Sequence, residues 1–170
     1  MVQVPVVAVS GVKNSGKTTL LCGLIPILKN KGLRPAVIKH DGHDYHPDPP
    51  GTDSCRLREA GACQVAVYSP RRFSLAVDRP GATVETLLAH FEAVDLVLLE
   101  GGKDSAWPKI EVVRGAVSRA PVGRPETLWA VVTDLGLDRA WPGVPVVGLG
   151  DYEELADLIL RRLQAAGLRG

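Results

Sequence analysis

The sequence lacks a surplus of charge of either sign. Its 20 lysine and arginine residues stand against 19 aspartate and glutamate residues, which gives a formal net charge of +1. Nonspecific binding to nucleic acid or to an anionic membrane depends on clustered positive charge. We therefore expect neither a nucleic-acid partner nor a membrane partner, and any other partner has to be inferred from local features of the chain.

Cysteine is also scarce, and the cysteines form no pattern typical of a disulfide framework. Cys22, Cys55 and Cys63 are odd in number and include no C-x-x-C pair. This usage favours free thiols in a reducing compartment over a secreted, disulfide-linked domain. We expect a cytoplasmic protein.

The amino terminus has neither a basic leader nor a long apolar run. Its segment "MVQVPVVAVSG" contains an apolar run of about seven residues, which is too short to span a bilayer or to serve as a signal peptide. We expect this segment to form a first β-strand.

Apolar runs and helical patterns alternate along the rest of the chain. Runs with Val and Leu on both alternating faces are typical of parallel strands buried on both sides, which predicts an α/β three-layer fold with a mostly parallel sheet. With 45% apolar residues, the 170-residue chain is expected to form a single domain over residues 1–170. Strands are predicted at 4–10, 35–40, 64–69, 73–78, 96–102, 109–114, 128–134 and 144–150, and helices at 17–32, 53–62, 84–93 and 152–167.

The strongest motif is "GVKNSGKT", residues 11–18, which matches the phosphate-loop pattern G-x-x-x-x-G-K-[ST] in full. It follows an apolar strand and opens a helical pattern, as such a loop requires. Gly11 and Gly16 let the backbone wrap closely, so that N–H groups and the positive end of the helix point at phosphate oxygens. The alternative is a glycine-rich turn with a solvated lysine.

Side chains at the end of this motif have distinct expected roles. Lys17 supplies a positive charge to the β and γ phosphates, and the Thr18 hydroxyl is a suitable Mg²⁺ ligand. Thr19 is placed to contact the α phosphate. The motif therefore predicts a nucleotide triphosphate site that uses Mg²⁺.

A phosphate loop needs a carboxylate at the end of a neighbouring buried strand to hold Mg²⁺ or its waters. Glu100 follows four consecutive aliphatic residues in "DLVLLEGG" and meets this requirement. Asp53, after the proline-rich segment 47–51, is a second candidate, although an aspartate before a helical segment also fits a helix N-cap. The alternative for Glu100 is a solvated strand end.

No N-K-x-D motif for guanine occurs in the chain. The nearest candidates are Thr133 and Asp134, which end a late strand in "VVTDLG". An aspartate there can accept two hydrogen bonds from the guanine edge. A strand-terminating aspartate in a turn is an equally good interpretation.

The segment "KHDGHDYH", residues 39–46, contains three of the four histidines. His40, His43 and His46 recur every third residue, which resembles metal-ligand spacing, but Gly42 and the prolines that follow disfavour a rigid helix. The segment comes directly after the second predicted strand, at the edge where open α/β sheets bind ligands. We interpret it as a functional loop beside the nucleotide, with metal binding as the alternative.

These motifs, in this order, resemble the adaptor proteins of molybdopterin-guanine dinucleotide biosynthesis, the MobB family of P-loop GTP-binding proteins. The resemblance lies in "GVKNSGKTTL", "KHDGHD", "PGTDSCRLREAGA", "DLVLLEGGK" and "PKIEVVR". It implies a Rossmann-like, homodimeric P-loop NTPase fold that binds GTP with Mg²⁺ and hydrolyses it slowly. It also implies an accessory role toward the guanylyltransferase that joins GMP to molybdopterin.

The resemblance assigns roles residue by residue. The implied nucleotide and pterin contacts are Gly11, Lys13, Asn14, Ser15, Gly16, Lys17, Thr18, Thr19, His40, His43 and Asp44, with Thr133 and Asp134 as base candidates. Thr18, Asp53 and Glu100 are the implied Mg²⁺-side residues, and Lys17 and Glu100 are the candidates for a catalytic role. Lys109, Ile110, Glu111 and Arg114 fall on the family's "KIE" segment.

Two other functions remain open on sequence grounds. A P-loop small-molecule kinase or ATP-dependent ligase would use Lys39 or the pair Arg71 and Arg72 to grip an anionic substrate. A GTP-dependent metallochaperone would carry nickel or zinc on the histidine loop.

Overall fold

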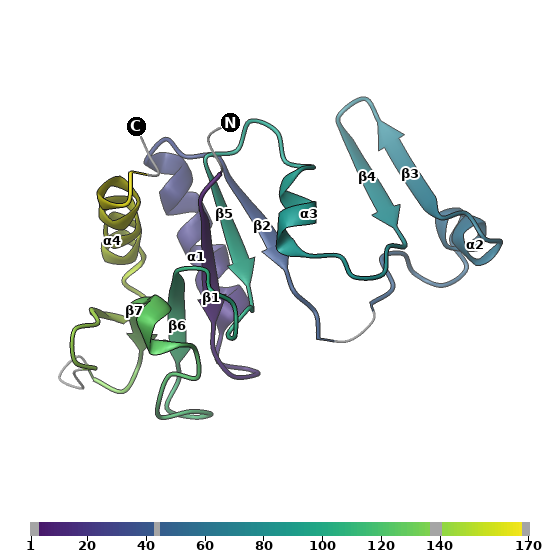
Figure 1. The fold of residues 1–170 in the computed structure, drawn as a ribbon. Helices are drawn as coiled ribbons and strands as arrows, with labels where there is room; N and C mark the ends of the chain where they lie inside the picture. Colours follow the sequence, from purple (N-terminus) through teal and green to yellow (C-terminus); the bar gives the residue numbers. More distant parts are fainter. Residues whose placement is uncertain (1–3, 43–44, 137–140, 168–170) are drawn as a thin grey trace. The chain divides into compact units, whose positions relative to one another are not determined.

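The computed structural model describes residues 4–42, 45–136 and 141–167. The chain falls into two compact units, one formed by Met1–His40 with Leu88–Gly170 and the other by Asp41–Leu87 (Figure 1). Each unit is described by itself below. The expectation of a single domain over residues 1–170 stays a prediction.

The larger unit is built on a parallel sheet, as the alternation of apolar runs predicts. Among the described residues the sheet has six strands in the order β2-β5-β1-β6-β7-β8, and every neighbouring pair is parallel. The strands are β1 (Val6–Ser10), β2 (Pro35–Lys39), β5 (Leu96–Glu100), β6 (Lys109–Val113), β7 (Leu128–Thr133) and β8 (Val146–Gly148). β1, β5 and β6 are buried along their whole length, which explains their near-continuous Val, Leu and Ile composition.

Two long helices cover one face of this sheet. α1 (Lys17–Asn30) and α4 (Tyr152–Ala165) pack against each other and against alternate residues of the central strands, which form the main core. Their contact is close at Gly23, where an added Cβ would lie 2.3 Å from the ring of Tyr152. α1 continues through Pro26 to Asn30, so the proline does not end the helix.

The opposite face is covered by two chain segments that contain no α-helix. Right-handed crossovers that run in opposite directions along the strand order must pass over opposite faces of the sheet. α1 connects β1 to β2 on one face, so segment 101–108, between β5 and β6, and segment 114–127, between β6 and β7, cross the other. An added Cβ on Gly102 would lie 2.9 Å from Leu99, which faces this side, and segment 114–127 contains the 3-10 helix η1 (Pro125–Thr127).

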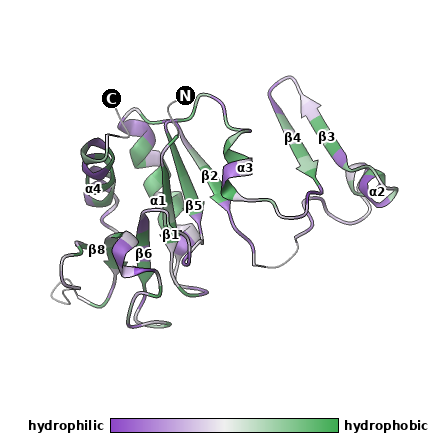
Figure 2. Cartoon of the chain, viewed as in Figure 1, coloured by the Kyte–Doolittle hydropathy of each residue, from purple (hydrophilic) through white to green (hydrophobic). Residues whose placement is uncertain are grey.

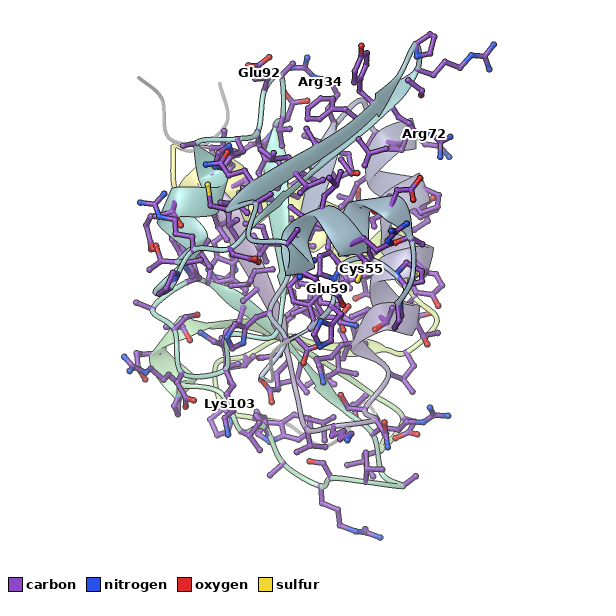
Figure 3. The ribbon with its side chains drawn as sticks, turned by 90° about the vertical axis from the view of Figure 1, so that its right-hand side faces the viewer. Arg34, Cys55, Glu59, Arg72, Glu92 and Lys103 are labelled. Atoms are coloured by element: carbon purple, nitrogen blue, oxygen red, sulfur yellow. The ribbon has the colours of Figure 1, made fainter. Side chains whose placement is uncertain are left out.

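The smaller unit contains a helix and a hairpin. α2 (Asp53–Glu59) packs on β3 (Gln64–Ser69), which pairs antiparallel with β4 (Arg72–Val77). Within α2, the Cys55 thiol lies 3.5 Å from the Glu59 carboxylate (Figure 3). The Arg58 side chain, 15% exposed, lies between the carboxylates of Asp48 and Asp78 at 3.7 and 3.6 Å.

The predicted helix over residues 84–93 is shorter than expected. α3 spans Val84–Leu88 and begins with reciprocal hydrogen bonds between Thr83 and Thr86. The turn ends with a bond from Phe91 N–H to the Leu88 carbonyl, and Ala93 has a φ of 53°, which a right-handed helix cannot accommodate. Among the described residues, no helix is long and apolar enough to cross a membrane.

Candidate nucleotide site

The carboxyl ends of the parallel strands gather most of the candidate residues at one edge of the sheet. The phosphate loop follows β1, Glu100 ends β5, and Thr133 ends β7. His40, directly after β2, donates its backbone N–H to the Glu100 carbonyl at 3.0 Å. His40 therefore lies beside the acidic strand end, and its predicted contact with a pterin phosphate or the transferase stays a prediction.

The phosphate loop has the backbone that its glycines predict. Gly11 and Gly16 have φ values of 143° and 98°, and Asn14 adopts a left-handed φ of 63°, which asparagine tolerates. The loop leads into the first turn of α1, where no acidic residue compensates the helix dipole and no side chain caps the helix. The first turn of α1 therefore contributes no anion of its own to its positive end, which suits a phosphate site.

Two side chains of the loop make defined contacts. Lys17 Nζ donates to the carbonyls of Gly11 and Val12 at 3.1 and 2.8 Å, so the ammonium lies over the loop. Thr18 Oγ1 donates to Glu100 Oε1 at 2.8 Å. The Glu100 side chain is largely buried, with a residue exposure of 9%. A hydroxyl and a carboxylate oxygen side by side are ligands that Mg²⁺ accepts.

The remaining residues of the phosphate loop differ in their exposure to solvent. Lys13, Asn14 and Thr19 are exposed, whereas Ser15 is fully buried and its hydroxyl has no hydrogen-bond partner among the described residues. A buried hydroxyl without a partner is uncommon and fits a loop whose polar groups await a ligand. The loop, the N-terminus of α1 and the Thr18–Glu100 pair together fit a nucleotide with Mg²⁺.

Asp53 lies in the smaller unit, so its predicted role beside Mg²⁺ stays a prediction. It is the first residue of α2, and its side chain is 97% exposed, 3.8 Å from Arg56. The alternative of an N-cap at Asp53 is wrong by one residue. Thr52 is the N-cap and accepts a hydrogen bond from Cys55 N–H at 3.4 Å, because its backbone is extended while that of Asp53 is already helical.

Both candidates for base recognition, Thr133 and Asp134, accept hydrogen bonds from nearby backbone N–H groups. Thr133 is buried and its hydroxyl accepts from Leu135 N–H at 3.1 Å. Asp134 is exposed, accepts from Gly115 N–H at 2.7 Å and lies 3.9 Å from Arg114. The Asp134 carboxylate therefore joins the ends of β6 and β7, and guanine recognition by it stays a prediction.

The histidine loop is described in part. His40 and His46 are exposed, whereas His43 and Asp44 lie outside the described residues. Within the described part of the chain, no cluster of three or more His, Cys, Asp or Glu residues has metal-binding geometry. The metallochaperone alternative stays untested for His43.

The residues of the kinase alternative are also exposed. Lys39 ends β2, and Arg71 and Arg72 lie at the turn of the β3–β4 hairpin (Figure 3). Arg71 and Arg72 belong to the smaller unit. Their proposed grip on an anionic substrate stays a prediction.

Comparison with known proteins identifies the family. The family model "MobB: Molybdopterin guanine dinucleotide synthesis protein B" matches residues 6–134. The chain belongs to the MobB family. The family expected from the ordered motifs is thereby confirmed.

Relatives and solved structures agree with this membership. Molybdopterin-guanine dinucleotide biosynthesis adapter proteins are 36% identical in Escherichia coli (strain K12), over 95% of this chain and 94% of that protein, and 36% identical in Haemophilus influenzae, over 92% and 88%. The crystal structure of Bacillus subtilis MobB matches with a TM-score of 0.75 at 27% identity, over 93% of this chain and 97% of that one. A second MobB crystal structure matches with a TM-score of 0.68 at 26% identity, over 93% and 99%.

Two charged residues of β6 have contacts that residue-by-residue reasoning missed. Lys109 and Glu111 are 0% and 1% exposed and were assigned through the resemblance to the MobB family alone. Burial lowers the pKa of Lys109, the nearby charge of Arg124 lowers it further, and Glu111 opposes the shift. The available signal was the sequence "KIEVV" itself, since a lysine and a glutamate inside a strand buried on both faces need partners there.

Proposed function

We propose that the protein binds GTP with Mg²⁺, hydrolyses it slowly and serves as an adaptor for the guanylyltransferase that attaches GMP to molybdopterin. The observation that carries the proposal is the phosphate loop at the N-terminus of α1, with Thr18 in contact with Glu100. Membership of the MobB family supports the biosynthetic context. The three free cysteines are consistent with a reducing, cytoplasmic location.

Each residue of the loop has a defined part in this proposal. Backbone N–H groups from Gly11 to Thr19 bind the phosphates, and Lys17 moves from the loop carbonyls to the β and γ phosphates. Thr18 and Glu100 hold Mg²⁺, which neutralises phosphate charge when bound. Asp53 remains a further candidate on the Mg²⁺ side, and His40, His43 and Asp44 remain candidates for the pterin phosphate or the transferase.

An adaptor with slow hydrolysis fits the described residues better than a fast GTPase. Fast GTPases place a glutamine that orients the attacking water, or an arginine that stabilises the transition state, beside the γ phosphate. The two described glutamines are Gln64 on β3 and Gln164 on α4, and neither lies in a loop at the carboxyl edge of the sheet. Arg114 follows β6 at this edge, but its guanidinium lies 3.9 Å from the Asp134 carboxylate. Hydrolysis would therefore rest on Lys17 and Glu100.

The proposal predicts a preference for GTP over ATP. Calorimetric titration of the purified protein in Mg²⁺ should give an affinity for GTP at least about tenfold higher than for ATP, because buried polar groups that read one base leave the other unpaired. Single-turnover hydrolysis should be slow for both nucleotides.

Other outcomes of this experiment separate the alternatives. Tighter binding of ATP, or phosphoryl transfer to a small acceptor, would contradict the adaptor function and favour the kinase or ligase. Stoichiometric retention of nickel or zinc on dialysis, lost in a His43→Ala, His46→Ala variant, would favour the metallochaperone. GTP-loaded protein used as bait should retain the purified guanylyltransferase, and failure to do so would remove the adaptor role.

We also propose that the protein is a homodimer that pairs through the β3–β4 hairpin. Side chains alternate along these strands, so Tyr68, Phe73 and Leu75 share one face while the buried Val65 lies on the other. Tyr68 is 86% and Phe73 is 77% exposed, and both strands carry apolar residues (green in Figure 2). An isolated two-stranded hairpin with a bare apolar face is marginally stable, and a second copy offers a complementary surface.

Replacing Phe73 with aspartate is expected to separate the dimer into monomers. A buried, unpaired carboxylate in the pairing face is costly, whereas Ser74→Asp changes the adjacent residue on the opposite face and should leave the dimer intact. Sedimentation equilibrium should give twice the 18.1 kDa chain mass for wild type and Ser74→Asp, and the chain mass for Phe73→Asp. An unchanged mass for Phe73→Asp would contradict pairing through this face.

A further inference from the structure

The face of the sheet opposite α1 and α4 contains two buried charges on the same strand. Lys109 and Glu111 alternate with Ile110 along β6, so both side chains point away from α1 and α4. Their exposures are 0% and 1%. Burying a lysine and a glutamate is costly unless each is hydrogen-bonded, and both are bonded to chain segments that lead to or from the nucleotide site.

Lys109 holds segment 101–108, which follows Glu100. Its Nζ donates to the carbonyls of Ser105 and Trp107 at 2.7 and 2.9 Å. Ser105 in turn donates its hydroxyl and its backbone N–H to the Gly102 carbonyl at 2.7 and 3.0 Å. Two glycines, Gly101 and Gly102, directly follow Glu100. Gly101 N–H donates to the Val9 carbonyl at 2.9 Å, and the turn from Gly102 to Ser105 is the next anchor of the segment.

Glu111 holds the end of β1 and segment 114–127. The Ser10 hydroxyl donates to Glu111 Oε2, and Val122 N–H donates to Oε1 at 2.9 Å. Ser10 is the residue directly before Gly11, where the phosphate loop begins. An added Cβ on Gly123 would lie 2.9 Å from Glu111 Oε2, so the segment approaches the carboxylate as closely as a glycine permits.

We propose that Lys109 and Glu111 are positioning residues of the nucleotide site, Lys109 for the Glu100 carboxylate and Glu111 for the phosphate loop. This inference rests on the proposed GTP and Mg²⁺ binding. The two residues act on different parts of the site, so their loss should have different signatures. Loss of the Lys109 anchor should weaken the Mg²⁺-dependent part of GTP binding, and loss of the Glu111 anchor should weaken phosphate binding with or without Mg²⁺.

The experiment measures GTP affinity in Mg²⁺ and in EDTA for a set of variants. Lys109→Met keeps the apolar stem and removes the donors. It should lower the ratio of the affinity in Mg²⁺ to the affinity in EDTA about fivefold, toward the ratio of Glu100→Gln. The affinity in EDTA should change little. Ser10→Ala should lower both affinities about fivefold and leave their ratio unchanged. Glu111→Gln retains an acceptor for Val122 and a donor for Ser10, and it should behave like wild type, whereas Glu111→Leu should lose affinity in both buffers.

Leu163→Ala is the stability control, because this residue is 1% exposed on α4 and packs on the other face of the sheet. If Lys109→Met does not fold, Ser105→Ala leaves the buried lysine in place and removes the hydroxyl bond to Gly102. It must then show a smaller fall in the ratio, because the backbone bond from Ser105 to Gly102 remains. If the ratio of the two affinities does not change, or changes only as much as in Leu163→Ala, the inference is overturned. The proposed function still stands in that case, provided that the wild-type protein binds GTP. Absence of GTP binding by wild type would overturn the proposed function and the inference with it.

Discussion

Replacing Lys17 with alanine is expected to reduce GTP affinity by at least about 100-fold, the equivalent of about 2.7 kcal/mol. The ammonium lies over the phosphate loop, where it donates to the carbonyls of Gly11 and Val12. On binding it exchanges these neutral acceptors for charged phosphate oxygens, which form stronger hydrogen bonds. The fold should survive, because the two carbonyls can accept hydrogen bonds from water.

Calorimetry with GTP and Mg²⁺ measures this loss, and circular dichroism with urea unfolding checks the fold. Lys29→Ala is the matched control, since it removes an exposed lysine from the last turn of the same helix, α1, and should leave the affinity unchanged. An affinity of Lys17→Ala within about threefold of wild type, less than a single charged hydrogen bond contributes, would refute the assignment of the phosphate site.

Replacing Gly11 with alanine is expected to lower the free energy of unfolding by about 2–5 kcal/mol and to abolish tight GTP binding. Two costs combine at this position. The φ of 143° is unfavourable for a residue with a side chain, and the new Cβ would lie 2.5 Å from the Val112 carbonyl oxygen. That carbonyl belongs to β6, which is paired on both sides, and it cannot retreat without distorting the sheet.

Gly32→Ala separates the two costs. Gly32 has a φ of 83°, and an added Cβ there would meet no atom within 4 Å, so this variant should lose about 1–2 kcal/mol from backbone strain alone. Gly32 follows the end of α1, away from the phosphate loop, so the Gly32→Ala variant should bind GTP normally. Urea unfolding of both variants measures the difference, and equal losses would show that the approach to Val112 contributes nothing.

The elements with strong periodicity could be predicted from the sequence. The helix expected at 17–32 is α1 at Lys17–Asn30, and the one expected at 152–167 is α4 at Tyr152–Ala165. Both bury a continuous apolar stripe, so burial and periodicity agree. The helix expected at 84–93 ends at Leu88, where a turn closed by Phe91 N–H and the Leu88 carbonyl follows, and periodicity does not report such a turn.

The pairing of the strands was harder to predict from the sequence than their positions. The segments 64–69 and 73–78 read as strands, but their alternation does not say that β3 and β4 pair with each other and form a sheet separate from the parallel one. The order of the parallel sheet likewise depends on contacts between distant segments. The direction of each crossover followed from handedness once the strand order was known.

The candidate site, like the fold, could be predicted from the sequence only in part. Phosphate-loop chemistry demands an acidic strand end, and the structure brings Glu100 to Thr18 as that reasoning requires. The anchoring of Lys109 could not be derived, because its partners are the backbone carbonyls of Ser105 and Trp107, in a segment with no sequence signature. The contact of Asp134 with Gly115 N–H is another backbone interaction that residue types do not encode.

The strand order also determines when this site can be assembled during synthesis. β1 and the phosphate loop leave the ribosome before their partners, because Val6 pairs with Val97, and Ser10 reaches Glu111 across a sequence separation of 101 residues. At ~5–20 residues per second, these partners emerge on the order of 5–20 s later. Until then an apolar strand buried on both faces in the finished sheet has no neighbour, which makes folding of the nucleotide site a late, long-range event and exposes β1 to aggregation in the meantime.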